Sequence, residues 1–447
     1  MTLMNVRPSL FPAIVLALAI PAFASAQPAS APAMPDQLDL KTAIGLAIEN
    51  NFAIRQARER IKQQEGVVVE VTAKAIPNVS ASGSFQVNDQ DISTTSPQSH
   101  DIWSLSVTAT QTLFAGGGVR SAIKNAKLVR ESALLDLKAT VNDALLTVRT
   151  NFYDVLLARE KITVQERNVE LLQQQLKTTT DRFEAGTVSS FEKLRAEVAL
   201  ANAKTPLITA RNDYRLAIES LRQSLGLPAS RYESVHKVPE FVGSLAYTPV
   251  EFDLQAAFES ARANRPDLQR LAKLAVAQQE SVTTARSNYY PTVEAFGGWT
   301  LRKGYTNSFG DSKDGFLAGV QSNWAIFDGR ATRGRVLQAR SALEQSKLSL
   351  TEAELATEVD VRRAYSSWQE ATELADVSKR VVEQAEEAVR LANARYNAGT
   401  GTQLDVLQAQ VDLTTARTNQ VQAYYTYNVA VANLRRAMGQ SDELVSQ

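Results

Sequence analysis

Two carboxylate residues follow glycine-containing turns that occur twice in the chain. Glu192 comes after the sequence RFEAGT, and Asp405 comes after the related sequence RYNAGT. Ser189-x-x-Glu192 and Thr402-x-x-Asp405 both have the spacing of a capping box, in which side chains at a helix start satisfy backbone amides that lack an intrahelical acceptor. Spacing alone therefore gives these carboxylates a structural role in starting two helices.

Other reactive residue types are scarce. The chain of 447 residues has no cysteine, and its two histidines, His100 and His236, have no second ligand at metal spacing. The segment AGGGVR lacks the lysine of a phosphate-binding loop. The 48 basic and 48 acidic residues give the chain no formal net charge, so no overall electrostatic field attracts nucleic acid. We therefore expect no enzyme activity, no cofactor, no metal and no nucleic-acid partner.

The first residues have the organisation of a secretory signal. Arg7 precedes an apolar stretch, 10–23, and Ala24-Ser25-Ala26 has the small residues of a cleavage site. The apolar stretch is too short for a membrane-spanning helix, which needs about 20 residues. We predict that residues 1–26 are removed, that the exported chain starts at Gln27, and that it carries no lipid anchor, because no N-terminal cysteine is available.

An internal duplication organises the rest of the chain. Leu40 and Asn50 correspond to Leu254 and Asn264, and Phe114 in TLFAGGGVR corresponds to Phe327 in AIFDGRATR. The turns RFEAGT and RYNAGT also correspond, as do the glycines after LRQSL and LRRAM. A period of roughly 200 residues is too long for a solenoid and indicates two equivalent halves.

Each half is predicted to contain a helix, a β-hairpin and two long helices. The predicted organisation is a first repeat at 27–227 (hairpin 76–114, helices 118–184 and 188–226), a linker at 228–252, a second repeat at 253–440 (hairpin 290–327, helices 330–397 and 402–438) and a C-terminal tail at 441–447. Strong helix formers fill the two longest segments, with no proline or glycine from Val119 to Phe183, so each reaches about 100 Å. Apolar residues three and four apart, such as Val141, Leu145 and Val148, indicate that these helices pack against partner helices in a coiled coil.

The hairpins alternate apolar and polar residues. In the first strand Val79, Phe85 and Val87 share one face, with serines on the other. Alternation over about 10 residues is typical of transmembrane β-strands, and Trp299 and Tyr305 near strand ends suit a membrane interface. A half-buried soluble hairpin shows the same alternation. Four such strands in lipid would leave open edges, so copies must associate: two copies give eight strands and three give 12, with a wider lumen.

These motifs together resemble the TolC family of outer-membrane efflux and type I secretion proteins. The resemblance covers essentially the whole mature chain and is carried by AIPNVSASG and YYPTVEAFG opening the hairpins, by LFAGGG and IFDGRATRGRV closing them, and by the two turns. It implies a mainly α fold with membrane β-strands: a coiled-coil tunnel and a 12-stranded β-barrel shared by a homotrimer. It also implies an outer-membrane duct that extends into the periplasm and works with a periplasmic adaptor and an inner-membrane transporter (RND, MFS or ABC type).

The resemblance further implies a gate at the periplasmic turns. By position, Glu192 and Tyr396 correspond to residues that hold the closed state, and Asp405 to an acidic ring that narrows the entrance. Two positions depart from the family: Gly401 replaces an arginine, and Gln408 replaces a second ring aspartate. The turn residues Gly186, Thr187, Gly399 and Thr400 are the predicted adaptor-docking positions. Capping and gating are compatible roles for the two carboxylates.

Two alternatives remain open from the sequence. The cargo of a duct is either small molecules or secreted proteins, and the chain does not distinguish them. A different class of protein, a periplasmic coiled-coil scaffold with soluble hairpins and no channel activity, would also contain long helices. The scaffold predicts a water-soluble protein, whereas the duct requires detergent for extraction and contacts outer-membrane lipid.

Overall fold

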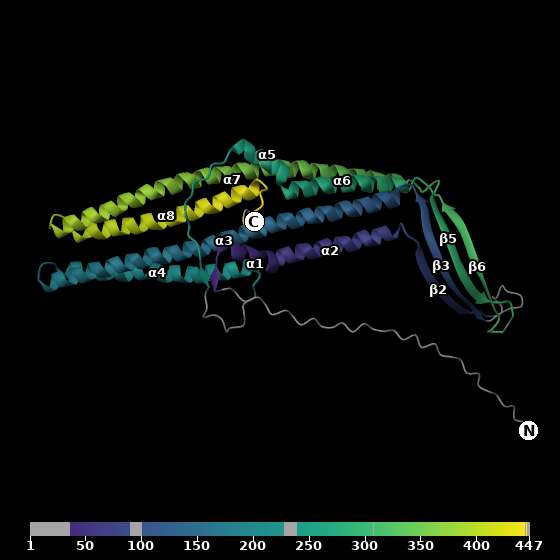
Figure 1. The fold of residues 1–447 in the computed structure, drawn as a ribbon, viewed down its shortest axis with the longest axis horizontal. Helices are drawn as coiled ribbons and strands as arrows, with labels where there is room; N and C mark the ends of the chain where they lie inside the picture. Colours follow the sequence, from purple (N-terminus) through teal and green to yellow (C-terminus); the bar gives the residue numbers. More distant parts are fainter. Residues whose placement is uncertain (1–35, 90–100, 228–238, 307, 443, 445–447) are drawn as a thin grey trace, which may run out of the picture.

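The computed structural model describes residues 36–89, 101–227, 239–306, 308–442 and 444. The predicted signal peptide, His100, His236, and parts of the predicted linker and C-terminal tail lie outside the described residues. The described chain forms an elongated molecule. A sheet lies at one end, and the two turns that connect the long helices lie at the other (Figure 1).

Both halves repeat one order of elements. The first half contains α1 (Leu40–Asn50), α2 (Phe52–Ala73), β2 (Asn78–Val87), β3 (Asp101–Ala115), α3 (Gly118–Glu184) and α4 (Ser190–Leu225). The second half contains α5 (Leu254–Asn264), α6 (Pro266–Ser287), β5 (Thr292–Lys303), β6 (Ser312–Asn323), α7 (Ala331–Asn397) and α8 (Gln403–Ala437). The short strands β1 (Gln37–Leu38) and β4 (Glu240–Phe241) pair in parallel beside the helices.

The long helices α3 and α7 have 67 residues each, which corresponds to about 100 Å of length. α4 continues through Pro206, although proline removes one backbone hydrogen bond from a helix interior. α3 packs against α4, and α7 against α8, to form two antiparallel pairs that run side by side (Figure 1). Among the described residues, no helix combines the length and apolar character that crossing a bilayer requires.

The helix preceding each hairpin is interrupted once. Asn51 ends α1 and caps α2, because its side-chain oxygen accepts the backbone N–H of Ala53 at 2.9 Å. Gly226, at the end of α4, packs on this break: a Cβ there would lie 2.3 Å from the carbonyl oxygen of Asn50. Gly439 packs on the equivalent break at Arg265, where a Cβ would lie 2.7 Å from the backbone nitrogen. Close backbone approach therefore explains the two glycines that correspond in the repeats.

The four long strands form one antiparallel sheet in the order β2-β3-β5-β6. Its register places Val107 between Ala81 and Trp299, so apolar residues share one face. A bulge between Thr112 and Phe114 shifts the pairing of β3 with β5 and accounts for the break in alternation near that end. Strands β2 and β6 are the two edges, and neither has a second partner in the described chain.

Polar side chains line the other face of the sheet. The hydroxyls of Ser82 and Ser106, and those of Ser84 and Ser104, are 2.8 Å apart across β2 and β3. Phe296 also points to this face, where its ring occupies the space above Gly319. The sheet therefore has a mainly apolar face, interrupted by Gln111 and Ser322, and a mainly hydroxyl-lined face.

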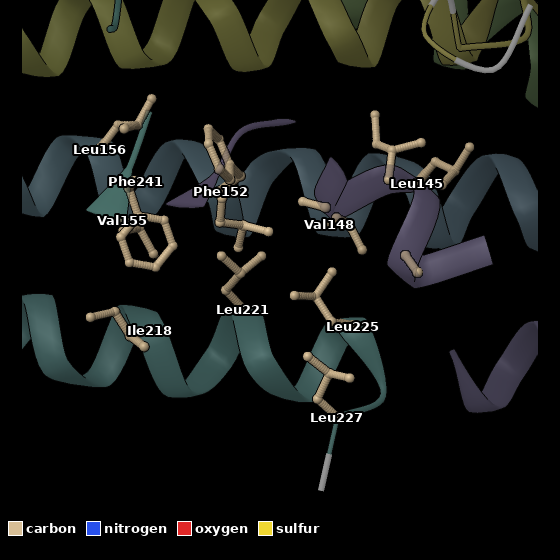
Figure 2. Close-up of a cluster of buried hydrophobic side chains, with 14 of the residues drawn as sticks. Leu145, Val148, Phe152, Val155, Leu156, Ile218, Leu221, Leu225, Leu227 and Phe241 are labelled. Carbon is tan, nitrogen blue, oxygen red and sulfur yellow. The ribbon is translucent and has the colours of Figure 1, made fainter. Parts of the chain in front are cut away.

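The largest hydrophobic cluster lies halfway along the helices. We call its labelled members in Figure 2 the mid-helix cluster: Leu145, Val148, Phe152, Val155, Leu156, Ile218, Leu221, Leu225, Leu227 and Phe241. Phe152, only 1% exposed, packs edge-on against Phe241 with ring centroids 6.2 Å apart. Val421 and Tyr424 of α8 pack against the same cluster, so it joins the two helix pairs.

Candidate functional site

The two turns at the end opposite the sheet have nearly identical backbones. Gly186 follows α3 with φ 73°, and Gly399 follows α7 with φ 71°, a left-handed conformation that favours glycine. The amide of Thr187 donates to the carbonyl of Arg182 at 2.9 Å, and the amide of Thr400 donates to that of Arg395 at 3.0 Å. These bonds close the last turn of each helix in the manner of a Schellman motif.

The predicted docking residues thus have defined positions. The hydroxyl of Thr187 donates to the Arg182 carbonyl at 2.9 Å, and the hydroxyl of Thr400 donates to the Arg395 carbonyl at 3.3 Å. Both turns are exposed at the extreme tip of the molecule (Figure 1). Rigid exposed turns suit binding of another protein, and their use as a docking site stays a prediction.

Asp405 caps α8 while keeping half of its carboxylate free. Its Oδ2 accepts from the Thr402 amide at 2.9 Å and from the Thr402 hydroxyl at 2.8 Å, and its own amide donates to the Thr402 hydroxyl. Oδ1 has no partner among the described residues. These bonds to Thr402 lower the pKa of Asp405 below its ordinary value of 3.8, so the exposed group carries a full negative charge at neutral pH.

Glu192 forms only half of the predicted capping box. Ser189 accepts the amide of Glu192 at 3.4 Å, but the Glu192 carboxylate makes no hydrogen bond or ion pair within the described chain. Gln408 is exposed and donates to Asp412 at 2.9 Å. Glu192 therefore presents an unpaired carboxylate beside the first turn, whereas Gln408 is engaged along its own helix.

Tyr396 is buried near the end of α7. Its ring lies 4.6 Å from the guanidinium carbon of Arg182, and its hydroxyl has no hydrogen-bond partner among the described residues. Arg182 also donates to Asn397 at 3.0 Å, so it ties α3 to α7. The predicted contact between Tyr396 and Glu192 is not made within this protomer, and it stays a prediction for contacts between copies.

Arg182 is a site residue that sequence reasoning did not assign. The resemblance implies an arginine at position 401, but this chain has glycine there; a Cβ would lie 3.0 Å from the Cβ of Arg395. The guanidinium over Tyr396 comes instead from the first half. The sequence repeat does point to Arg182, because the turn sequences RFEAGT and RYNAGT both begin with arginine.

A group of buried polar residues lies between α3 and α8 near the turns. We call it the polar seam: Gln175, Thr179, Gln403 and Gln410. The amide of Gln403 donates to the Thr179 hydroxyl at 3.2 Å. Three other polar atoms, Gln175 Nε2, Gln403 Oε1 and Gln410 Oε1, are buried without a partner. Such atoms cost free energy, so the contact between the helix pairs is weak here.

Comparison with known proteins identifies the class. The chain is 28% identical over 391 residues to protein CyaE of Bordetella pertussis, covering 86% of this chain and 81% of that protein. It is 23% identical over 372 residues to outer membrane protein TolC of Vibrio cholerae, covering 82% and 83%. Its fold matches the CmeC outer membrane channel of Campylobacter jejuni with a TM-score of 0.78 and 15% identity, covering 91% and 88%. The fold and the relatives define an outer-membrane channel protein of the efflux and secretion class.

The model of the family described as "Outer membrane efflux protein" matches residues 43–227 and 257–440, and the chain belongs to that family. The predicted membership in the TolC family and the predicted fold class, long helices with membrane strands in two repeats, are confirmed. The relatives are channel proteins, in agreement with the expectation that the chain is not an enzyme.

Proposed function

We propose that the protein is the homotrimeric exit duct of a tripartite export system, with a sheet in the outer membrane and a gate at the periplasmic turns. The observation that carries this proposal is the four-stranded sheet with two open edges. Backbone groups at an open edge in lipid cost several kcal/mol each, so β2 of one copy pairs with β6 of the next. Three copies close a barrel of 12 strands with room for a lumen.

The faces of the sheet support this closure. Phe316, 90% exposed in the isolated chain, shares its apolar face with Val79, Phe85 and Val320, which are also exposed. Exposed apolar side chains are stable against lipid, whereas their exposure to water is unfavourable. The serine-rich face, with its hydroxyl pairs between β2 and β3, then lines an aqueous lumen.

The helices support association in the same way. Ile208 and Leu216 on α4, and Leu348 and Leu355 on α7, are exposed apolar residues on the long helices. Such rows need a partner helix. Because the sheet edges already require a second copy, we infer that α4 and α7 of adjacent copies pack together and close the tunnel wall.

The tip residues then form the gate. Three copies of Asp405 around the axis repel one another and favour cations, through the Oδ1 atoms that capping leaves free. The unpartnered hydroxyl of Tyr396 and the unpaired carboxylate of Glu192 are a donor and an acceptor with no partner inside one protomer. We infer that they meet between copies in the closed state, after a local shift of α7 that exposes the buried Tyr396 hydroxyl.

The exposed turns are the proposed docking site for a periplasmic adaptor, which connects the duct to an inner-membrane transporter of the RND, MFS or ABC type. The chain supplies no driving force of its own in this proposal. Export starts with the signal at residues 1–26, and the mature chain has no lipid anchor. N-terminal sequencing of the membrane-bound protein should give Gln27 first; retention of Met1 would contradict the signal.

The decisive experiment compares extraction and mass. The duct predicts that the protein leaves the membrane fraction only with detergent and has the mass of three chains. A variant lacking residues 290–327 should lose membrane insertion, because its sheet keeps two strands. A water-soluble wild-type protein would instead support the periplasmic scaffold without channel activity.

A further inference from the structure

Basic residues gather where the helices meet the sheet. Across residues 71–79, 113–130, 281–293 and 324–343, the chain has ten lysines and arginines but one acidic residue, Asp328. This segregation is marked in a chain with 48 residues of each sign. We call the outermost exposed members the basic collar: Lys74, Arg120, Arg286, Arg330, Arg333 and Arg335.

The collar lies at one level of the molecule. Lys74 and Arg286 are at the ends of α2 and α6, and Arg120 and Arg333 are in the first turn of α3 and α7. All four helix ends lie beside the sheet (Figure 1). Of the deeper basic residues, Lys124 pairs with Glu280 at 2.6 Å and Arg130 with Glu65 at 2.7 Å. The collar residues form no ion pair within the described chain.

Folding does not explain the charges on α3 and α7. A helix N-terminus carries a partial positive charge and favours acidic residues in its first turn. The tip helices α4 and α8 follow this rule with Glu192 and Asp405. α3 and α7 have no acidic residue in the first turn and place arginines there instead. Asp328 is the one nearby carboxylate: it accepts the Thr332 amide at 2.7 Å and interacts electrostatically with Arg335, so a single negative charge stands against three arginines at the start of α7.

Arg330 is a second, independent indication that positive charge at this level has a function. It has φ 74° and is the one non-glycine residue with positive φ in the described chain. The equivalent position before α3 is Gly117, with φ 82°. Glycine adopts this conformation without strain, so an arginine here keeps its charge at a conformational cost.

Exposed apolar residues lie between the collar and the sheet. Ile326 and Phe327 are 85% and 84% exposed, and Phe114, Tyr290 and Trp324 are also exposed. Aromatic rings next to lysine and arginine are typical of a membrane–water interface. Copies related by symmetry bring the same excess of basic over acidic residues to the same level.

We propose that the basic collar binds the phosphate groups of anionic phospholipids in the membrane leaflet that faces the helices. This inference rests on the proposed orientation of the sheet in the outer membrane. It assigns the junction a function in anchoring the duct at a fixed depth, through charge as well as through the strands. Exposed charges are screened by salt, so the binding weakens as ionic strength rises.

The test uses the detergent-extracted oligomer equilibrated with equal amounts of phosphatidylglycerol and phosphatidylethanolamine. Co-purified lipids are quantified by mass spectrometry. The wild type should retain phosphatidylglycerol at least about threefold over phosphatidylethanolamine in 0.1 M salt, and less in 0.5 M salt. The variant Arg330→Gly/Arg333→Gln/Arg335→Gln should lose at least half of this enrichment. Arg330→Gly removes strain, so this variant is expected to fold.

The matched control is Arg363→Gln/Lys379→Gln/Arg380→Gln, which removes three exposed charges farther along α7. It should retain the wild-type enrichment. Inorganic phosphate should displace no more lipid than chloride at equal ionic strength; specific displacement would indicate a small-anion site and overturn the proposal. An intact, conducting oligomer without lipid enrichment would also overturn it, while a protein that forms no membrane oligomer would instead overturn the proposed function.

Discussion

The mid-helix cluster and the polar seam join the same two helix pairs by opposite means. In the cluster, Phe152 and its neighbours exclude water and leave no polar atom to satisfy. In the seam, Gln403 makes one hydrogen bond to Thr179 and leaves its carbonyl oxygen unpartnered. Burying a large apolar side chain contributes about 2–3 kcal/mol, whereas a neutral hydrogen bond contributes about 1 kcal/mol and an unsatisfied buried group costs more.

The difference indicates where the molecule is able to move. The middle of the helices is fixed by apolar packing and by ion pairs, including Arg149 with Asp442 at 2.7 Å. Near the turns, the described residues join the pairs through the bonds of Arg182 and Gln403, through Thr414 with Asn168 at 3.1 Å, and through a small apolar cluster of Leu172, Ala203 and Leu407. We therefore expect α7 and α8 to separate from α3 and α4 at the turns while the middle stays closed.

The largest expected effect is on the mid-helix cluster. Phe152→Ala should lower the free energy of unfolding by about 3–5 kcal/mol, because it removes a fully buried ring and leaves a cavity. Urea unfolding of the detergent-extracted protein, followed by circular dichroism, measures this change. Val69→Ala, at an exposed position of α2, is the control and should stay within about 0.5 kcal/mol of the wild type. A loss below about 1 kcal/mol for Phe152→Ala would contradict the assigned role of the cluster.

The next effect concerns the polar seam. Gln410→Leu removes a buried oxygen without a partner, which should stabilise the closed contact by about 1–3 kcal/mol. The open fraction in planar-bilayer recordings should then fall at least about fivefold. Asn419→Leu, on the exposed side of the same helix and outside the proposed gate, should leave it unchanged. Equal behaviour of the two variants would show that the seam does not control opening.

Tyr396→Phe separates the roles of one hydroxyl. Within the protomer the hydroxyl has no partner, so its removal should leave the unfolding free energy within about 1 kcal/mol of the wild type. If the hydroxyl binds Glu192 of the adjacent copy, the variant should admit large antibiotics into cells. Glu192→Gln should cause a similar leak, and the double variant should add little. Normal impermeability of all three would exclude this latch.

The smallest effect is the pH dependence of Asp405. Its pKa is lowered by the bonds to Thr402, so the capping contribution to stability is full above the ordinary value of 3.8. The contribution is lost as the pH falls through the still lower pKa of the folded state. Cation selectivity should therefore persist at pH 5 and decline below pH 4. Asp405→Asn should lack both the selectivity and this decline. A decline well above pH 4.5 would indicate that repulsion between copies outweighs capping.

Much of the fold followed from sequence because its patterns are long and repeated. The long runs of helix formers in α3 and α7 and the alternation in four strands are signals that a single residue does not change. The bulge near Thr112 and the placement of Phe296 over Gly319 were not predicted, because both depend on pairing with another strand. The break at Asn51 was also missed, since it depends on packing against Gly226.

The candidate site was predicted less completely for a similar reason. Asp405 and its cap are local in sequence and follow from spacing of three residues. Arg182 reaches Tyr396 from a helix in the other half of the chain, and no pattern of residues close in sequence predicts that contact. The polar seam resembles ordinary surface glutamines until α3 and α8 are placed together, although Gln403 and Gln410 have the heptad spacing of core positions.

The most direct test of the account joins the two helix pairs at the seam. The chain has no cysteine, so Thr179→Cys/Gln403→Cys introduces one defined thiol pair across the seam. Gln403 reaches Thr179 through its long side chain, so the pair is joined by a short, reducible bis-thiol cross-linker and not by a direct disulfide. Single-channel recordings should give a small, cation-selective conductance when the pair is cross-linked, and a higher open fraction after reduction. Equal conductance in both states would contradict opening at the seam, and the absence of any conductance would contradict the outer-membrane duct itself.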